Sequence, residues 1–293
     1  MYSVFLPTRR SGNWLGAHQK FDRLAYRLVV AHVQAKHFPA LNQILHFEGF
    51  NGPDGLIAKS PGQHEPRHYY DPIEDKGPVL EFVQTHYDGL VEAFKKDDQV
   101  KSSFELAWLG HAVTDGLTPA HHFPYVETVE ELHALANHRV KGVKDKLIIR
   151  GETGQETLKH TFKYWGKKGM AASHTHFEAG VAATIAAYRF GELYLHQEQI
   201  EEARALGHMR YFKRRAKMVA RLNMYDRFIM SGWTVGLARQ TRHVLAPIIV
   251  ETVATMWLLA YEEAHGPVHY QNPPEHILRR YQAKKTKQKL RPE

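Results

Sequence analysis

Histidine and carboxylate residues at metal-binding spacing are the part of this sequence best suited to chemistry. His111 and Asp115 lie four residues apart in the string His-Ala-Val-Thr-Asp, and His174 and Glu178 repeat that spacing in His-Thr-His-Phe-Glu. Residues four apart share one face of an α-helix, so each pair would present an imidazole beside a carboxylate. Imidazole nitrogens and carboxylate oxygens are ligands that zinc and similar divalent cations take from proteins.

Four further residues extend this pattern. His121 follows the first pair, after a glycine and a proline that should end the helix. Asp54 lies in Asn-Gly-Pro-Asp-Gly, His68 lies in Arg-His-Tyr-Tyr-Asp-Pro, and His18 stands at the start of the first helical segment. Each feature alone is weak, because 21 histidines and 31 acidic residues produce such spacings by chance. Their order and spacing together predict a metal site.

Helical periodicity predicts the elements that must hold these residues. Apolar residues recur at helical spacing in 18–37, 78–97, 102–115, 128–146, 157–165, 170–196, 198–224 and a last helix containing 248–260. Residues 41–71 are rich in glycine and proline, and we expect them to form a long structured loop. No strand-like alternation persists. The sequence therefore predicts an all-α fold, with a single multi-helix domain over residues 1–265.

Charge is distributed unevenly along the chain. The net charge is +8, but residues 276–293 hold seven basic residues against one acidic residue, so the rest of the chain is close to neutral. We expect residues 266–293 to be a basic, disordered tail. A nearly neutral body disfavours a protein that follows a nucleic-acid backbone. The absence of cysteine excludes disulfides and thiolate metal sites.

The sequence also bears on localisation. Residues 1–6 are apolar, but Arg9 and Arg10 follow at once, which is unlike a signal peptide. The longest apolar stretch, 245–261, is interrupted by Pro247 and Glu251 and is too short and polar for a transmembrane segment. We expect a cytoplasmic protein and leave peripheral contact with a membrane surface open.

The ordered set of residues resembles the zinc-dependent phospholipase C family, which is related to the single-strand-specific zinc nucleases. The most specific part of the resemblance is the block Leu-Gly-His111-x3-Asp115-x3-Pro119-Ala-His121. The remaining parts, in the family's order, are His18, Asp54, His68-Tyr-Tyr-Asp-Pro and His174-x3-Glu178. The resemblance covers about residues 17–183 and implies the helical fold of that family.

By position, the resemblance implies a site for two or three zinc ions. The first ion would be surrounded by Asp54, His68, His111 and Asp115. The second would be held by His121, His174 and Glu178, with positions open for water and substrate. Asp115 would bridge to a third ion, which His18 would also bind. Secreted members complete the third site with the free amine of an N-terminal tryptophan, which this chain lacks, so we expect two zinc ions and leave the third open.

One further departure from the family pattern, and one choice between ligands, concern the second ion. The interval from His121 to His174 is longer than in the phospholipases, so we expect an inserted helical segment at about 125–169. His176 is an alternative ligand to His174, since it also precedes Glu178. We prefer His174 because a residue two positions from Glu178 would point to a different face of the helix.

The resemblance implies hydrolysis of a phosphoester by zinc-activated water, with Asp54 both binding metal and accepting the proton of that water. The expected substrate is a phospholipid or another small phosphodiester. A single-strand nuclease or nucleotidase of the same superfamily is the alternative activity. A helical zinc-binding protein without catalysis is the alternative from another class. An all-α protein with no metal and a histidine-rich surface is a further alternative.

Overall fold

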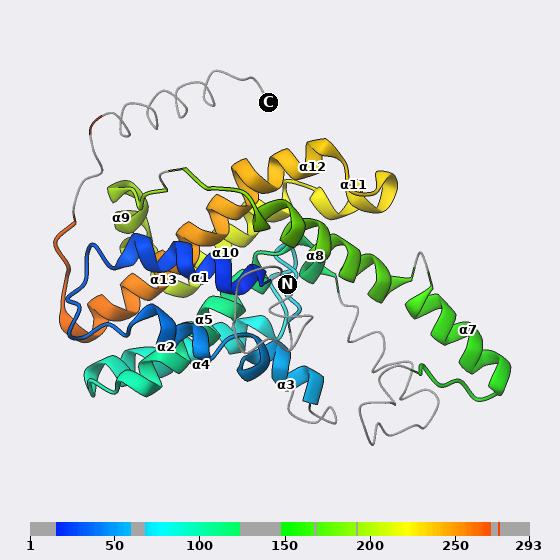
Figure 1. The fold of residues 1–293 in the computed structure, drawn as a ribbon, viewed down its shortest axis with the longest axis horizontal. Helices are drawn as coiled ribbons and strands as arrows, with labels where there is room; N and C mark the ends of the chain where they lie inside the picture. Colours follow the sequence, from blue (N-terminus) through cyan, green and yellow to red (C-terminus); the bar gives the residue numbers. More distant parts are fainter. Residues whose placement is uncertain are drawn as a thin grey trace.

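The observed secondary structure is helical, as the periodicity predicts (Figure 1). The computed structural model describes residues 16–59, 68–123, 148–166, 169–191, 193–270 and 275. Within these ranges no β-strand forms, and a single antiparallel bridge joins Asp71 to Lys76. The all-α class is therefore confirmed.

The helices up to residue 123 carry most of the predicted ligands. They are α1 (Ala17–Val29), α2 (Leu41–His46), the 3-10 turn η1 (Gly49–Asn51), α3 (Pro53–Lys59), α4 (Val79–Lys95), α5 (Gln99–Gly116) and the 3-10 turn η2 (Pro119–His122). The later helices are α7 (Gly154–Trp165), α8 (Met170–Ala186), α9 (Gln197–Leu206), α10 (His208–Ala220), α11 (Met224–Ser231), α12 (Val235–Gln240), the π turn η4 (Thr241–Leu245) and α13 (Ala246–His265).

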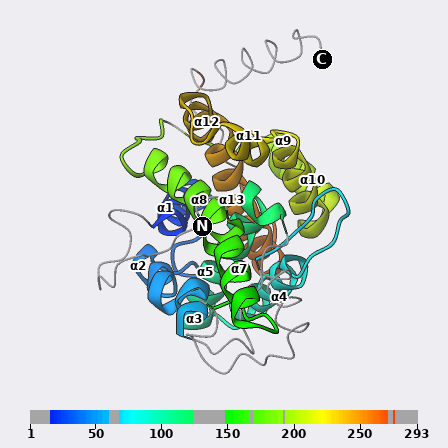
Figure 2. The ribbon, with the colours of Figure 1, turned by 90° about the vertical axis from the view of Figure 1, so that its right-hand side faces the viewer.

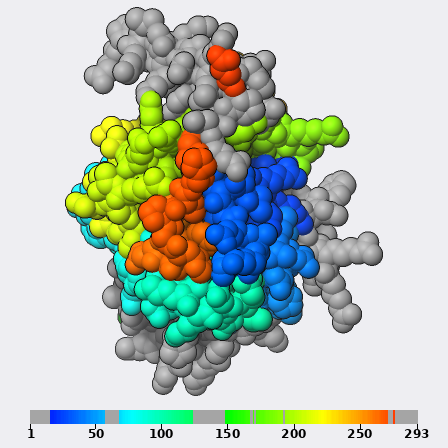
Figure 3. Space-filling view, turned by 90° about the vertical axis from the view of Figure 1, so that its left-hand side faces the viewer, coloured from blue at the N-terminus to red at the C-terminus, as the bar shows by residue number. Residues whose placement is uncertain are grey.

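Helix α13 forms the centre of the fold. Its side chains are buried around most of the helix, and Ile249, Met256 and Trp257 are fully enclosed. The indole Nε1 of Trp257 donates a hydrogen bond to the carbonyl oxygen of Leu106 on α5, at 2.9 Å. Helices α1, α4, α5, α9 and α10 pack around α13. Figure 3 shows its C-terminal end, in orange, closely packed between α1 in blue and the yellow-green helices.

The same region passes a simple test for a membrane span. The continuous helical stretch Val235–His265 is long and apolar enough to cross a bilayer by length and composition. However, 78% of its most apolar window is buried inside the protein. Its apolar surface is thus used in packing against other helices, as in the core helix of a globular domain.

Several predicted helix boundaries were wrong. The first helix ends at Val29 instead of residue 37, and the helix expected over 170–196 ends at Ala186. The single helix expected over 198–224 is broken into α9 and α10 at Gly207. Gly207 has a φ of +78° with extended ψ, a conformation that essentially only glycine adopts, so the helix cannot continue through it.

The long loop expected over residues 41–71 was also wrong, because this segment contains α2, η1 and α3. The glycines and prolines separate short helical turns and do not prevent them. Pro53 occupies the first position of α3, where a missing N–H costs nothing. A Cβ at Gly55 would lie 2.1 Å from the carbonyl oxygen of Phe50, so only glycine lets α3 pack this closely against η1.

Three predictions fall wholly or partly outside the described residues. The helix expected over 128–146 lies wholly outside them. Of the inserted segment expected at about 125–169, the described part includes the helix α7. The basic tail is described only at residues 266–270 and 275.

Candidate metal centre

The eight predicted ligands lie together in one connected cluster. They come from α1, α3, the segment before α4, α5, η2 and α8. Four overlapping groups have ligand atoms within 4.8 Å of one another: His18 with His111 and Asp115, Asp54 with His68 and His111, His68 with Asp115 and His121, and His121 with His174 and Glu178. Residues separated by up to 160 positions are thus brought to one place by the tertiary fold.

Helix α5 supplies the central pair. It begins at the N-cap Asp98, whose side chain accepts a hydrogen bond from the Lys101 amide. Three turns later, His111 Nε2 lies 3.2 Å from Asp115 Oδ2, and both side chains are fully buried. The helix thus places an imidazole beside a carboxylate, as the spacing of four predicts.

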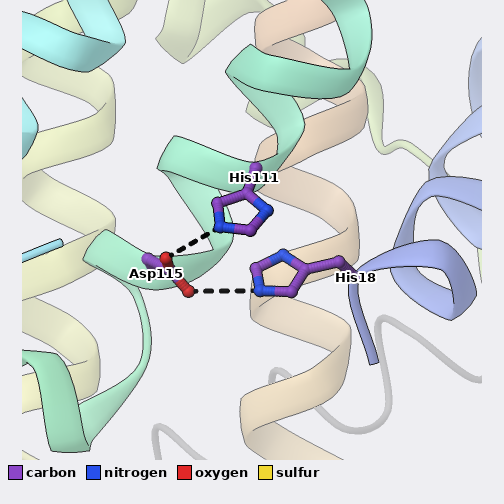
Figure 4. A group of neighbouring side chains, drawn as sticks. All are labelled: His18, His111 and Asp115. Carbon is purple, nitrogen blue, oxygen red and sulfur yellow. Dashed lines mark ion pairs between the residues drawn. The ribbon is translucent and has the colours of Figure 1, made fainter. Parts of the chain in front are cut away.

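Asp115 is the centre of the cluster. His18 Nε2 lies 3.3 Å from its Oδ1, and His121 Nε2 lies 3.5 Å from the same oxygen. His68 Nδ1 is hydrogen-bonded to its other oxygen, Oδ2. Figure 4 shows His18 reaching Asp115 from α1 and His111 reaching it from its own helix. One carboxylate therefore contacts four imidazole rings, an arrangement suited to bridging more than one cation.

The imidazoles of this cluster carry nitrogens that have no hydrogen bond. Nδ1 of His18 and Nε2 of His68 are buried without a hydrogen-bond partner among the described residues. Nε2 of His18 and Nε2 of His111 lie 3.2 to 3.5 Å from carboxylate oxygens, without the geometry of a hydrogen bond. The His18 and His111 rings stack in parallel, with centroids 3.8 Å apart. Unpaired buried polar atoms are costly, and a divalent cation would satisfy several at once. The residues present therefore fit a bound metal ion.

Asp54 lies at the more open side of the cluster. It is in the first turn of α3, where the helix dipole favours a carboxylate. Its Oδ1 lies 3.5 Å from His111 Nε2, and its side chain is 29% exposed. Burial would raise the pKa of Asp54, but the nearby His111 outweighs burial and holds that pKa below its ordinary value. Asp54 is therefore ionised at neutral pH and accessible to a small molecule.

The second predicted group is assembled between η2 and α8. Glu178 Oε1 lies 2.8 Å from His121 Nε2 and 3.0 Å from His174 Nε2. The carbonyl oxygen of His121 accepts a hydrogen bond from the Tyr70 amide, which ties η2 to the segment carrying His68. His176 is exposed and belongs to none of the metal-compatible groups among the described residues. The geometry thus favours His174 over His176.

Glu48 is a buried neighbour of the cluster that the sequence did not predict. Its carboxylate lies 3.4 Å from His111 Nδ1 and accepts a hydrogen bond from the Gly49 amide at 3.2 Å. A carboxylate at Nδ1 keeps the proton on that nitrogen and directs Nε2 toward Asp54 and Asp115. Glu48 therefore orients His111 as an outer partner of the site. Nothing in its local sequence distinguishes it from an ordinary acid.

Asp22 is the second residue that the sequence analysis missed. It lies one helical turn after His18 on α1, and neither carboxylate oxygen has a hydrogen-bond partner among the described residues. Burial, and then the charge of Glu48, raise the pKa of Asp22 well above its ordinary value. A Cβ at Gly110 would lie 2.7 Å from Asp22 Oδ1, so α1 and α5 approach closely here. The spacing of four from His18 was the available signal.

Protonation differs between two of the central histidines. Burial alone would lower the pKa of His111, but the carboxylates of Asp115, Glu48 and Asp54 raise it well above the ordinary value. Burial lowers the pKa of His121 to about 3. At neutral pH the metal-free protein therefore carries a protonated His111 and a neutral His121. Metal binding requires neutral imidazoles.

We therefore expect zinc binding at pH 7 to release about one proton from His111. The affinity for zinc should fall as the pH is lowered, because more protons must then be displaced. Calorimetric titration in two buffers of different ionisation enthalpy measures the proton release directly. A binding enthalpy independent of the buffer would contradict the predicted protonation of His111.

Replacing Glu48 by glutamine should weaken zinc binding by about 10- to 100-fold, because outer partners orient metal ligands at that level. Competition with a chromophoric chelator measures the affinity. Glu105→Gln is a matched control, since Glu105 is equally buried and pairs with His86 and Lys101 away from the cluster. Equal zinc affinities in the two variants would show that Glu48 has no specific role.

Among the described residues, one other group outside this cluster has metal-compatible spacing. His37, Asp97 and His265 lie near one another, but Asp97 and His265 are exposed. His37 Nδ1 lies 2.6 Å from Asp97 Oδ1, so an ion pair or hydrogen bond satisfies this contact. The buried cluster is therefore the stronger candidate for a metal centre.

Comparison with protein-family models, curated proteins and solved structures gave no match to this chain. The geometry of the cluster is therefore the evidence on which any function must rest.

Proposed function

We propose that this protein is a zinc-dependent phosphoesterase that resembles the zinc-dependent phospholipases C. The observation that carries the proposal is the convergence of five histidines and three carboxylates, from six separate parts of the fold, into overlapping groups of metal-compatible geometry. Zinc ions bound in such a site supply positive charge to the phosphoryl oxygens and lower the pKa of water.

The residues of the chain have distinct roles in this proposal. His121, His174 and Glu178 would hold one ion, and Asp54, His68 and His111 would hold another beside Asp115, which contacts both His68 and His111. A third group consists of His18, His111 and Asp115. It shares His111 with the group that contains Asp54 and His68. Most of these side chains are buried, so they exclude bulk water and keep one geometry.

Asp54 is the residue placed to accept a proton from the attacking water. Its exposed fraction lets a water molecule reach the carboxylate, and its lowered pKa keeps that carboxylate ionised. A carboxylate of low pKa is a weak base, so its orientation of water contributes more than its basicity. Glu48 supports this geometry by holding the His111 ring in place.

The surface next to η2 favours a small phosphoester over nucleic acid. A cavity there is lined by aromatic rings, Phe123 and Tyr225, and by the acids Asp71, Glu74 and Asp226. The Tyr225 ring packs against that of Phe177, the residue before Glu178, with centroids 5.3 Å apart, so this cavity lies near the second group. Acidic walls repel a polyanion but suit a substrate with a cationic group. A phospholipid with a cationic headgroup is therefore the preferred substrate.

Elemental analysis of the dialysed protein, run beside hydrolysis of a chromogenic phosphodiester and of phosphatidylcholine, tests the proposal. We expect two or more zinc ions per chain, with activity lost on chelation and restored by zinc. Hydrolysis of single-stranded DNA in place of both esters would favour the nuclease activity. Bound zinc without turnover of any ester would favour a non-catalytic zinc protein, and less than one metal per chain after zinc is supplied would refute the metal site.

A further inference from the structure

Helix α7 displays an apolar face to solvent. Leu158 is 72% exposed, Phe162 is 74% exposed and Trp165 is 42% exposed. These residues follow one another at positions i, i+4 and i+7, so they lie along one side of the helix. Figure 1 shows α7 beyond the start of α8, extending away from the helices around α13, and Figure 2 views the molecule from that side. No residue of α7 is buried.

The side of α7 that faces the preceding segment 148–151 is the more polar one. Thr157 Oγ1 accepts a hydrogen bond from the Gly151 amide at 2.9 Å, and Thr161 Oγ1 accepts one from the Ile149 amide at 3.1 Å. A surface helix of a globular protein normally directs its apolar side inward and its polar side to water. Helix α7 has the opposite arrangement, which marks a surface that contacts a partner.

The N-terminus of α7 is stabilised by capping hydrogen bonds. Thr153 Oγ1 accepts a hydrogen bond from the Glu156 amide, and the Glu156 carboxylate accepts one from the Thr153 amide. This reciprocal capping box stabilises the first turn. The exposed apolar face therefore belongs to a helix whose N-terminus is stabilised by its own capping interactions.

The charges around this face indicate the chemistry of the partner. Lys159 and Lys163 are exposed beside the apolar residues. Between residues 148 and 168 the sequence has five basic residues and two acidic ones. An amphipathic helix with tryptophan, phenylalanine and leucine on one side and lysine beside them is typical of binding in the interface of an anionic membrane.

We propose that α7 docks onto the surface of a phospholipid bilayer that contains anionic lipid. The proposal rests on the proposed function, because it identifies the substrate as a lipid presented in a membrane. Only four residues separate α7 from α8, the helix that carries His174 and Glu178. Docking of α7 would therefore hold His174 and Glu178 of the metal centre close to the lipid headgroups.

Vesicle sedimentation with the full chain tests the proposal. The double variant Leu158→Ser/Phe162→Ser should bind vesicles of phosphatidylcholine and phosphatidylglycerol at least tenfold more weakly than the wild type. The matched control is Ile229→Ser/Met230→Ser on α11, whose side chains are 54% and 73% exposed. This control should bind like the wild type.

The electrostatic part has its own variant. Lys159→Gln/Lys163→Gln should weaken binding to vesicles that contain phosphatidylglycerol and leave the weaker binding to pure phosphatidylcholine unchanged. All of these variants should keep wild-type zinc content and hydrolysis of a soluble phosphodiester. If the wild type binds vesicles through α7 but hydrolyses no ester, the proposed function is contradicted and the docking surface is still supported.

Three results would overturn the docking surface. The first is absence of wild-type binding to either kind of vesicle, and the second is equal loss of binding in the α7 and α11 double variants. The third is a lipid-free dimer in gel filtration that Leu158→Ser/Phe162→Ser converts to a monomer, since a second copy of the chain would then cover this face.

Discussion

Replacing Asp115 by asparagine is expected to remove at least one zinc ion per chain and to lower phosphoester hydrolysis by at least about a hundredfold. Asp115 contacts the imidazoles of His18, His68, His111 and His121. A neutral side chain at this position therefore removes the negative charge that all four imidazoles contact. Loss of an outer partner alone typically costs 10- to 100-fold, and loss of a shared ligand should cost more.

Asparagine has nearly the shape of aspartate, which keeps the core packing of α5. Elemental analysis and hydrolysis of a chromogenic phosphodiester measure the two effects, and circular dichroism checks that the variant is folded. Unchanged zinc content and rate would mean that Asp115 serves only as an ion-pair partner for the histidines. The proposed bridging role would then be abandoned.

His174→Ala and His176→Ala should differ sharply, although the two residues are neighbours on α8. His174 Nε2 lies 3.0 Å from Glu178 Oε1 and its ring meets that of His121, with centroids 4.6 Å apart. His176 is exposed on a different side of the helix. We expect His174→Ala to lose one zinc ion and at least about a hundredfold in hydrolysis, and His176→Ala to retain both.

The comparison is informative because the two variants share their helix and their amino-acid change. Zinc stoichiometry by elemental analysis separates them directly. If His176→Ala lost zinc and His174→Ala did not, the second group would have to be rebuilt around His176. Loss of zinc in both would point to a general disturbance of α8.

Local geometry explains why the paired ligands could be predicted. The spacing of four in His111–Asp115 and in His174–Glu178 determines a shared face once the segment is helical, whatever surrounds it. Both pairs are adjacent in the structure, at 3.2 Å and 3.0 Å. The helical class was equally readable, because apolar periodicity reports which side of each helix faces the core.

Errors arose where a local signal was ambiguous. Glycine and proline in residues 41–71 predict a loop, yet Pro53 begins a helix and Gly55 allows that helix to pack against η1. The break at Gly207 depends on its positive φ, which a glycine permits but does not require. Glycine and proline therefore indicate that the chain changes direction, but they do not show whether it forms a loop, starts a helix or breaks one.

The sequence by itself determined that this protein is helical and that two of its helices each carry a histidine and a carboxylate on one face. Only the tertiary structure decided that His18, Asp54 and His68 meet these pairs, because their contacts join segments far apart in the chain. The roles of Glu48 and Asp22 are likewise tertiary, since each depends on a partner from another segment. The apolar side of α7 was visible as a pattern, but its outward direction is a property of the fold, because only packing decides which face of an amphipathic helix remains exposed.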